Sequence, residues 1–236
     1  MLSTDEDSGG SLRAFVIGNG PSLNDTPVDG LRNEFTIGMN RFNLLGLDWD
    51  PNWWVMVDVN HDDGWWNWDD LLYRDSTFLF REHDRDLVES YRKDAVFIDH
   101  CIHRTYRGDV DEWAWHLPDL CSRGGGASMA IQVAASLGHN PIYLVGCDLY
   151  KYRGPDDVDV NHFDPDYCPY KIRRSTGEEV IGPADWDRLN KRLIKAHTMA
   201  RDSADSMGLT VENATVGGQL EVYPRVDINT VLNGKN

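Results

Sequence analysis

The chain has 236 residues, 41% of them hydrophobic, and a formal net charge of −16 at pH 7. This length can bury one large core with at most a small lid, and no run approaches the roughly 18 apolar residues that a membrane span needs. The negative charge disfavours nucleic acids and anionic membranes as partners, because like charges repel each other.

The predicted elements alternate between short strands and helices along the chain. Residues 1–11 are acidic and lack the basic and apolar regions of a signal peptide, so they predict a disordered N-terminus and a cytoplasmic protein. Most strand candidates are continuous apolar runs, typical of strands buried on both faces: residues 14–17, 35–38, 53–58, 77–80, 95–98, 142–146, 209–213 and 220–223. Amphipathic or alanine-rich patterns predict helices over residues 84–92, 128–137 and 184–207. The alternation favours an α/β fold, with a single Rossmann-like, doubly wound and mostly parallel sheet over residues 12–230.

One long stretch, about residues 150–182, shows little periodicity of either kind. A compact domain rarely carries so long a loop unless the loop is a lid or a binding element. Four tyrosines and Phe163 lie in this stretch, so we expect an irregular lid rather than a disordered excursion.

The first predicted strand leads into Gly18-Asn19-Gly20-Pro21-Ser22. Glycines at a strand end permit positive φ and close backbone approach, and the amide groups there can bind a phosphate. The dinucleotide fingerprint has a third glycine, which is missing here, and Pro21-Ser22 stands where its helix begins. The loop therefore indicates a nucleotide-linked donor and argues against NAD.

Two further strand ends and one helix start carry residues suited to ligand binding. Asp58 ends the third predicted strand, and Gly146-Cys147-Asp148-Leu149-Tyr150 follows the sixth. The glycine-rich run Arg123-Gly124-Gly125-Gly126-Ala127-Ser128 opens a helix with bare backbone, which suits an anion. Because ligands of open α/β sheets bind beyond the carboxyl ends of the strands, we expect these groups to line one site.

These motifs, in this order, resemble the bacterial sialyltransferases of glycosyltransferase family 42. The shared features are residues 17–23, Asn40 with Phe42, the glycine-rich helix start and residues 142–150. They are also similar to a related family that includes archaeal 6-hydroxymethylpterin pyrophosphokinases and flagellin glycosylation factors. The resemblance implies a GT-A-like fold that transfers a sugar, with inversion, from a nucleotide-activated donor such as a CMP-linked sugar. It further implies a glycan or small-molecule acceptor, a homo-oligomer and no required metal cofactor.

The resemblance also implies roles for particular residues. Two asparagines that hold the cytidine nucleotide correspond to Asn19 and Asn40, and a tyrosine that steadies the departing phosphate corresponds to Tyr150. Tyr152 stands in for a second tyrosine, and His162 for the histidine general base on the lid. Together with the loops above, the expected donor-binding residues are Gly18, Asn19, Gly20, Ser22, Asn40, Asp58, Gly125, Gly126, Ser128, Gly146 and Asp148.

The residues around His162 support two interpretations. Inverting glycosyl transfer needs one base of near-neutral pKa to take the acceptor's proton, and a histidine on an aromatic segment suits that role. Alternatively, His162 is a surface residue whose charge is balanced by its neighbours Asp157, Asp159, Asp164 and Asp166.

A cluster of carboxylates favours a second class of function. Asp58, Asp62 and Asp63 are candidate Mg²⁺ ligands, which would suit a Mg²⁺-dependent pyrophosphokinase acting on a pterin. A nucleotide-binding module without turnover is a third alternative. The excess of Asp over Glu makes chance clusters common, and it fits either a halophilic-type or an ordinary acidic protein. The four cysteines lack zinc-site spacing, so we expect reduced thiols.

Overall fold

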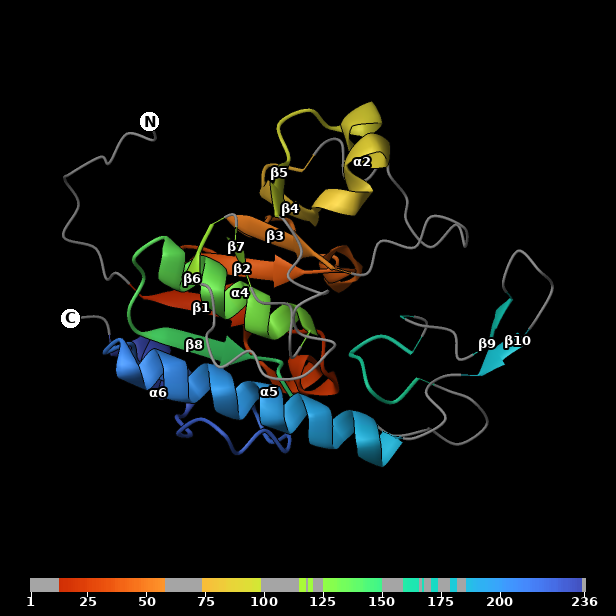
Figure 1. The fold of residues 1–236 in the computed structure, drawn as a ribbon. Helices are drawn as coiled ribbons and strands as arrows, with labels where there is room; N and C mark the ends of the chain where they lie inside the picture. The colour runs from red at the N-terminus through yellow and green to blue at the C-terminus, as the bar shows by residue number, and fades with distance from the viewer. Residues whose placement is uncertain are drawn as a thin grey trace.

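The computed structural model describes residues 13–57, 74–98, 115–117, 119–120, 125–149, 159–165, 167, 171–173, 179–181 and 186–234. At its centre lies a seven-stranded sheet of order β11-β8-β1-β2-β3-β4-β5, in which every neighbouring pair is parallel (Figure 1). The strands are β1 (Ala14–Ile17), β2 (Phe35–Met39), β3 (Trp53–Met56), β4 (Thr77–Arg81), β5 (Val96–Ile98), β8 (Ile142–Val145) and β11 (Val211–Asn213). Helices flank the sheet, which confirms the predicted Rossmann-like α/β fold.

The strand order reverses next to β1. From β1 the chain builds β2, β3, β4 and β5 outward to one edge, then returns to place β8 on the other side of β1, with β11 beyond it. The carboxyl ends of β1 and β8 are therefore the topological switch point of the sheet. In open α/β sheets, ligands bind in the crevice outside this point.

Alternate residues of each strand pack into two cores. Ala14 and Val16 of β1 face one core, which also holds α4 (Gly125–Ser136) and the small residues Ala200 and Ala204 of α5 (Trp186–Ser206). Both helices lie on the same side of the sheet in Figure 1. Because α4 contributes small or slender side chains, it packs closely across several strands.

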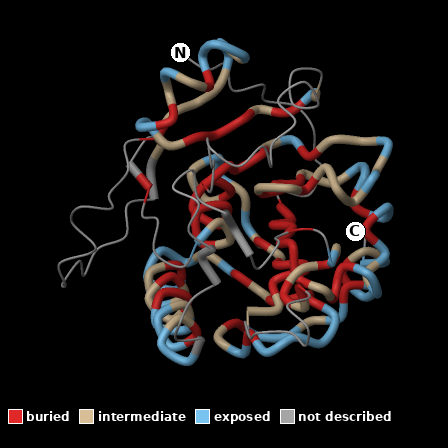
Figure 2. Tube along the Cα trace, turned by 90° about the vertical axis from the view of Figure 1, so that its right-hand side faces the viewer, coloured by how far each residue is buried: buried red, intermediate tan, exposed pale blue. Residues whose placement is uncertain are grey.

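The opposite face is covered by shorter elements. Phe15 and Ile17 of β1 pack there with the stacked rings of Trp54 and Phe78, whose centroids are 5.3 Å apart. The covering elements are η1 (Pro21–Asp25), η2 (Val28–Leu31), η3 (Phe42–Leu45), α2 (Arg85–Tyr91), which follows η4 (Glu82–Asp84), and α6 (Ile228–Asn233). In Figure 2 the buried residues gather in the interior of the fold, and most exposed residues lie at its periphery.

The predicted strand over residues 220–223 is wrong. Leu220 and Tyr223 are buried, but they lie in a loop. In the described residues after β11, the sheet is extended only by an isolated bridge between Arg225 and Asn213. These side chains are apolar because they fill the core beneath α5, which a strand pattern cannot distinguish from sheet pairing.

Other boundaries shift by a few residues. The helix predicted from residue 128 begins at Gly125, and the third strand ends at Met56 rather than at residue 58. Two antiparallel pairs were not predicted: β6 (Trp115–His116) with β7 (Asp119–Leu120), and β9 (Lys171–Arg173) with β10 (Glu179–Ile181). The second pair lies in the stretch predicted as a lid. Among the described residues, no helix combines the length and apolar character needed to cross a membrane.

Candidate functional site at the switch point

Backbone contacts join the loop after β1 to the loop after β8. The N–H of Gly18 donates to the carbonyl of Val145 at 2.7 Å, and the N–H of Gly20 donates to the carbonyl of Gly146 at 2.8 Å. A Cβ on Gly18 would lie 2.3 Å from the carbonyl oxygen of Gly146, closer than a side chain can approach. We call this contact between residues 18–22 and 145–148 the seam. It brings the two glycine-containing loops together at the switch point.

Ser22 and Asp148 close the seam with a side-chain contact. The hydroxyl of Ser22 donates to Oδ2 of Asp148 at 2.7 Å, and the N–H of Gln219 donates to the carbonyl of Asp148 at 2.9 Å. Burial raises the pKa of Asp148 above its ordinary value, while the bond from Ser22 acts in the opposite direction. Both polar side chains are thus engaged in joining the loops.

Asn19 presents a hydrogen-bond acceptor that none of the described residues uses. Its Nδ2 donates to the carbonyl of Met39 at 3.0 Å, which fixes the amide, because a flipped amide would place two oxygens together. The residue is only 9% exposed, and its Oδ1 has no hydrogen-bond partner among the described residues. A buried acceptor without a partner costs about 1–3 kcal/mol, so a ligand N–H or O–H at this point would be stabilising.

Asn40 links the ends of β2 and β3. It has φ of 45°, its N–H donates to the carbonyl of Val55 at 2.9 Å, and its Oδ1 accepts from the N–H of Val57 at 3.1 Å. The indole N–H of Trp54 donates to the carbonyl of Asn40 at 2.7 Å. These bonds occupy the acceptors of Asn40 and leave its Nδ2 as the group suited to an anionic oxygen.

The N-terminus of α4 lies at the same edge of the sheet. A Cβ on Gly126 would lie 3.0 Å from Sδ of Met39, which precedes Asn40, and 3.5 Å from a methyl group of Val57, which bonds to the Asn40 side chain. The first amides of this 12-residue helix suit a phosphate by geometry and dipole. Ser128 is fully buried and its hydroxyl donates to the carbonyl of Gly125 at 2.9 Å, so the helix itself uses that donor.

Part of the predicted lid is anchored to the loops after β1 and β2. The N–H of Phe163 donates to the carbonyl of Asn19 at 3.0 Å, and the side chain of Asn24 donates to the carbonyl of Phe163 at 3.0 Å. Arg41 donates from its guanidinium to the carbonyl of Tyr167 and from its N–H to the Tyr167 hydroxyl. Phe163 and Tyr167 are buried in the core beneath. Residues 159–165 and 167 therefore belong to the body of the domain.

His162 is held in place by this anchored segment. Its Nδ1 lies 2.6 Å from Oδ2 of Asp159, and its ring stacks on Tyr167 with centroids 4.0 Å apart. Its side chain is 17% exposed, whereas the side chain of Asp159 is 2% exposed. The imidazole is thus fixed against the molecule and does not project from the surface.

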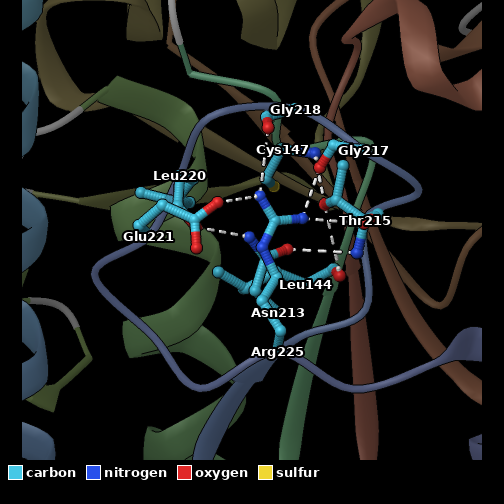
Figure 3. A network of polar contacts seen from close by, with 9 residues as sticks. All are labelled: Leu144, Cys147, Asn213, Thr215, Gly217, Gly218, Leu220, Glu221 and Arg225. Carbon is cyan, nitrogen blue, oxygen red and sulfur yellow. Dashed lines mark hydrogen bonds and ion pairs between the residues drawn. The ribbon is translucent and has the colours of Figure 1, made fainter.

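A separate network orders the loop that follows β11 (Figure 3). The Arg225 guanidinium donates to the carbonyl oxygens of Thr215 and Gly218, at 3.0 and 3.1 Å, and to Glu221 at 2.6 Å. The hydroxyl of Thr215 in turn accepts from the N–H of Cys147 at 3.0 Å. The loop after β8 is thus fixed from both sides, by the seam and by this network.

The predicted site residues divide into two groups. Those that the structure places around the switch point and the neighbouring strand ends are Gly18, Asn19, Gly20, Ser22, Asn40, Gly125, Gly126, Ser128, Gly146, Asp148 and His162. The predicted residues Asp58, Asp62, Asp63, Tyr150 and Tyr152 lie outside the described residues. Within the described ranges, no group of three or more His, Cys, Asp or Glu side chains could hold a metal ion.

Sequence reasoning gave no site role to Arg41 or Tyr167, and it named Asp159 only as one of four acidic neighbours of His162. Arg41 and Tyr167 join the anchored segment to the loop after β2, and Asp159 pairs with His162. The spacing of Asp159 and His162, three residues apart, was the available signal. It was hidden because aspartates crowd this segment.

The chain was compared with protein-family models, with curated proteins and with solved structures, and no match was found in any of them.

Proposed function

We propose that this chain is a transferase that moves a sugar from a nucleotide-activated donor, with a CMP-linked sugar as the first candidate, to a hydroxyl acceptor. The supporting observation is that His162 is tied to the loop after β1 by the 3.0 Å bond from the N–H of Phe163 to the carbonyl of Asn19. The histidine that we propose as the proton acceptor and the loop that we propose to bind the nucleotide thus lie at one switch point.

The chemistry fits the groups at this site. The acceptor oxygen attacks the anomeric carbon of the donor, the bond from that carbon to the phosphate oxygen breaks, and the nucleotide leaves with the electron pair. His162 takes the proton of the acceptor hydroxyl. The amides at the start of α4 and the Nδ2 of Asn40 are suited to the negative charge that grows on the phosphate. The buried Oδ1 of Asn19 is suited to a hydroxyl or amino group of the nucleoside.

Ligand binding tests the nucleotide site. CMP, UDP, GDP and ATP are each added with and without Mg²⁺, and the melting temperature is measured. We expect stabilisation by CMP or one nucleoside diphosphate that does not require Mg²⁺, because ligand binding to the folded state raises its stability. Stabilisation by ATP in the presence of Mg²⁺ alone would instead favour a pyrophosphokinase, and no stabilisation by any nucleotide would refute the site.

Substitution of His162 tests the base. With the donor that the panel selects, His162→Ala is expected to lower the transfer rate by roughly 10²–10⁴-fold, the range for a lost general base, while nucleotide binding persists. His139→Ala is the matched control, because His139 stacks on Phe35 at the start of β2. The site lies at the carboxyl ends of the strands, and Phe35 lies at the opposite, amino ends. Equal rates for the two variants would remove His162 from the mechanism.

A further inference from the structure

Asp159 is a buried carboxylate whose two oxygens have different partners. Its Oδ1 accepts from the N–H of Asn161 at 2.8 Å, and its Oδ2 lies 2.6 Å from Nδ1 of His162. The side chain is 2% exposed. Burial of a carboxylate is costly unless it is paired and hydrogen-bonded. The contacts with Asn161 and His162 supply that compensation for Asp159.

The contact determines which imidazole nitrogen carries the proton. A carboxylate only accepts hydrogen bonds, so the bond to Oδ2 of Asp159 requires the proton on Nδ1 of His162. In the neutral ring the lone pair then lies on Nε2. The backbone bond from Asn161 prevents the carboxylate from rotating away from the ring.

Tyr167 fixes the plane of the same ring. Its ring lies nearly parallel to that of His162, at an interplanar angle of 13°. Tyr167 is itself 7% exposed and is bound by Arg41 through its carbonyl and hydroxyl oxygens. The position, plane and tautomer of the imidazole are all set by neighbouring groups, which is the arrangement expected of a preorganised base.

We propose that Asp159 is the positioning residue of His162, and that it holds the imidazole in the tautomer whose proton-accepting nitrogen is Nε2. The role of Nε2 in catalysis rests on the proposed transferase function, whereas the tautomer itself does not. Serine hydrolases use an Asp–His pair in the same way, and replacing that aspartate with asparagine leaves the wrong tautomer.

Asp159→Asn is the test, because it should invert the tautomer with little change in shape. In the variant, the amide oxygen is expected to keep the bond from the N–H of Asn161, which turns the amide NH₂ toward Nδ1 of His162. Nδ1 must then accept, so the proton moves to Nε2. Long-range ¹H–¹⁵N spectra of ¹⁵N-histidine-labelled protein at about pH 8.5, where an ordinary histidine is neutral, distinguish the two forms. His162→Gln assigns the signal, and Asp164→Asn is the matched control for loss of one charge in the same segment.

The wild-type spectrum alone can overturn the inference. It must show His162 protonated on Nδ1, and a ring protonated on Nε2 would refute the assignment even if Asp159→Asn did not fold. In the folded variant we expect protonation on Nε2, with Asp164→Asn unchanged, and an unchanged tautomer would equally refute it.

Transfer kinetics separate this inference from the proposed function. Asp159→Asn is expected to lower kcat by roughly 10²–10⁴-fold with the KM for the donor unchanged, as for a lost general base. An inverted tautomer together with a wild-type kcat would show that His162 is not the base, while the positioning by Asp159 would stand. An unchanged tautomer together with a lowered kcat would overturn the positioning and leave the transferase proposal in place.

Discussion

Two asparagines at adjacent strand ends have opposite hydrogen-bonding character. Asn19 has a buried acceptor without a partner in the described structure, because its NH₂ group is used by the carbonyl of Met39. Asn40 has its oxygens engaged by Val57 and Trp54, so its remaining group is a donor. A ligand that fits both must offer an O–H or N–H beside an anionic or carbonyl oxygen. A nucleoside monophosphate carries both kinds of group.

Binding of deoxynucleotides tests whether the Asn19 side-chain oxygen accepts a hydrogen bond from a ribose hydroxyl. We expect removal of one ribose hydroxyl, in 2′-deoxy-CMP or 3′-deoxy-CMP, to weaken binding to the wild type by roughly tenfold, since one hydrogen bond contributes about 1 kcal/mol. In Asn19→Ala the deoxy analogue and CMP should bind alike. Titration calorimetry measures the affinities.

Asn52→Ala is the control for this experiment. Asn52 accepts from the N–H of Thr36 near the amino end of β2, away from the carboxyl ends where Asn19 lies. This control variant should keep the wild-type discrimination. If the wild type binds CMP and both analogues equally, Asn19 does not contact a ribose hydroxyl.

At the scale of elements, α5 contributes a buried histidine as well as apolar side chains. His197 is 3% exposed, and its Nδ1 lies 3.1 Å from the hydroxyl of Tyr223, in the loop after β11. Burial lowers the pKa of His197 from 6.5 to about 4 and raises the pKa of Tyr223. The helix and the loop that the Arg225 network orders are therefore joined through a neutral imidazole.

Acid should destabilise the protein through His197. In the unfolded chain His197 takes up a proton near pH 6.5, whereas in the folded chain it stays neutral down to about pH 4. The free energy of unfolding therefore falls as pH falls through this window. Once the pH is below both pKa values, the free energy of unfolding has fallen by about 3 kcal/mol, because each unit of the pKa difference corresponds to about 1.4 kcal/mol. Urea denaturation at pH 7, 6, 5 and 4.5 measures it.

His197→Gln is the comparison, since it keeps a polar partner for Tyr223 and does not titrate. Carboxylates contribute equally to both proteins, so the difference between their slopes isolates the histidine. Parallel pH profiles would show that His197 is not buried as described.

At the scale of the whole molecule, the net charge of −16 should make stability depend on salt. Raising KCl from 0.1 to 1 M shortens the screening length from about 10 Å to about 3 Å, which weakens repulsion among surface charges. We expect the melting temperature to rise, and NaCl to act like KCl because screening depends on ionic strength. A melting temperature that is flat or falls with salt would contradict a halophilic-type surface.

The sheet was largely predictable from the sequence, because strands buried on both faces appear as continuous apolar runs with turn residues between them. The run at residues 220–223 failed for the same reason, since a buried loop shows an identical pattern. The glycines at the ends of β1 and β8 indicated where the two loops of the seam lie, and the structure shows them in close backbone contact there, whereas ligand binding by these loops stays a prediction. The particular pairing of Asp159 with His162 was only one of several possibilities, because four aspartates lie near His162 and the sequence does not indicate which one becomes buried.

The seam has a consequence for how the protein is made. Ser22 and Asp148, which it joins, are 126 residues apart in the chain. During synthesis, β1 can pair with β2 early, but its other edge must wait for β8, with its N–H and C=O groups open to any other strand. Contacts of such long range form slowly and leave a nascent chain exposed to aggregation. The seam is therefore among the last features to form, and no truncated chain that ends before β8 can possess it.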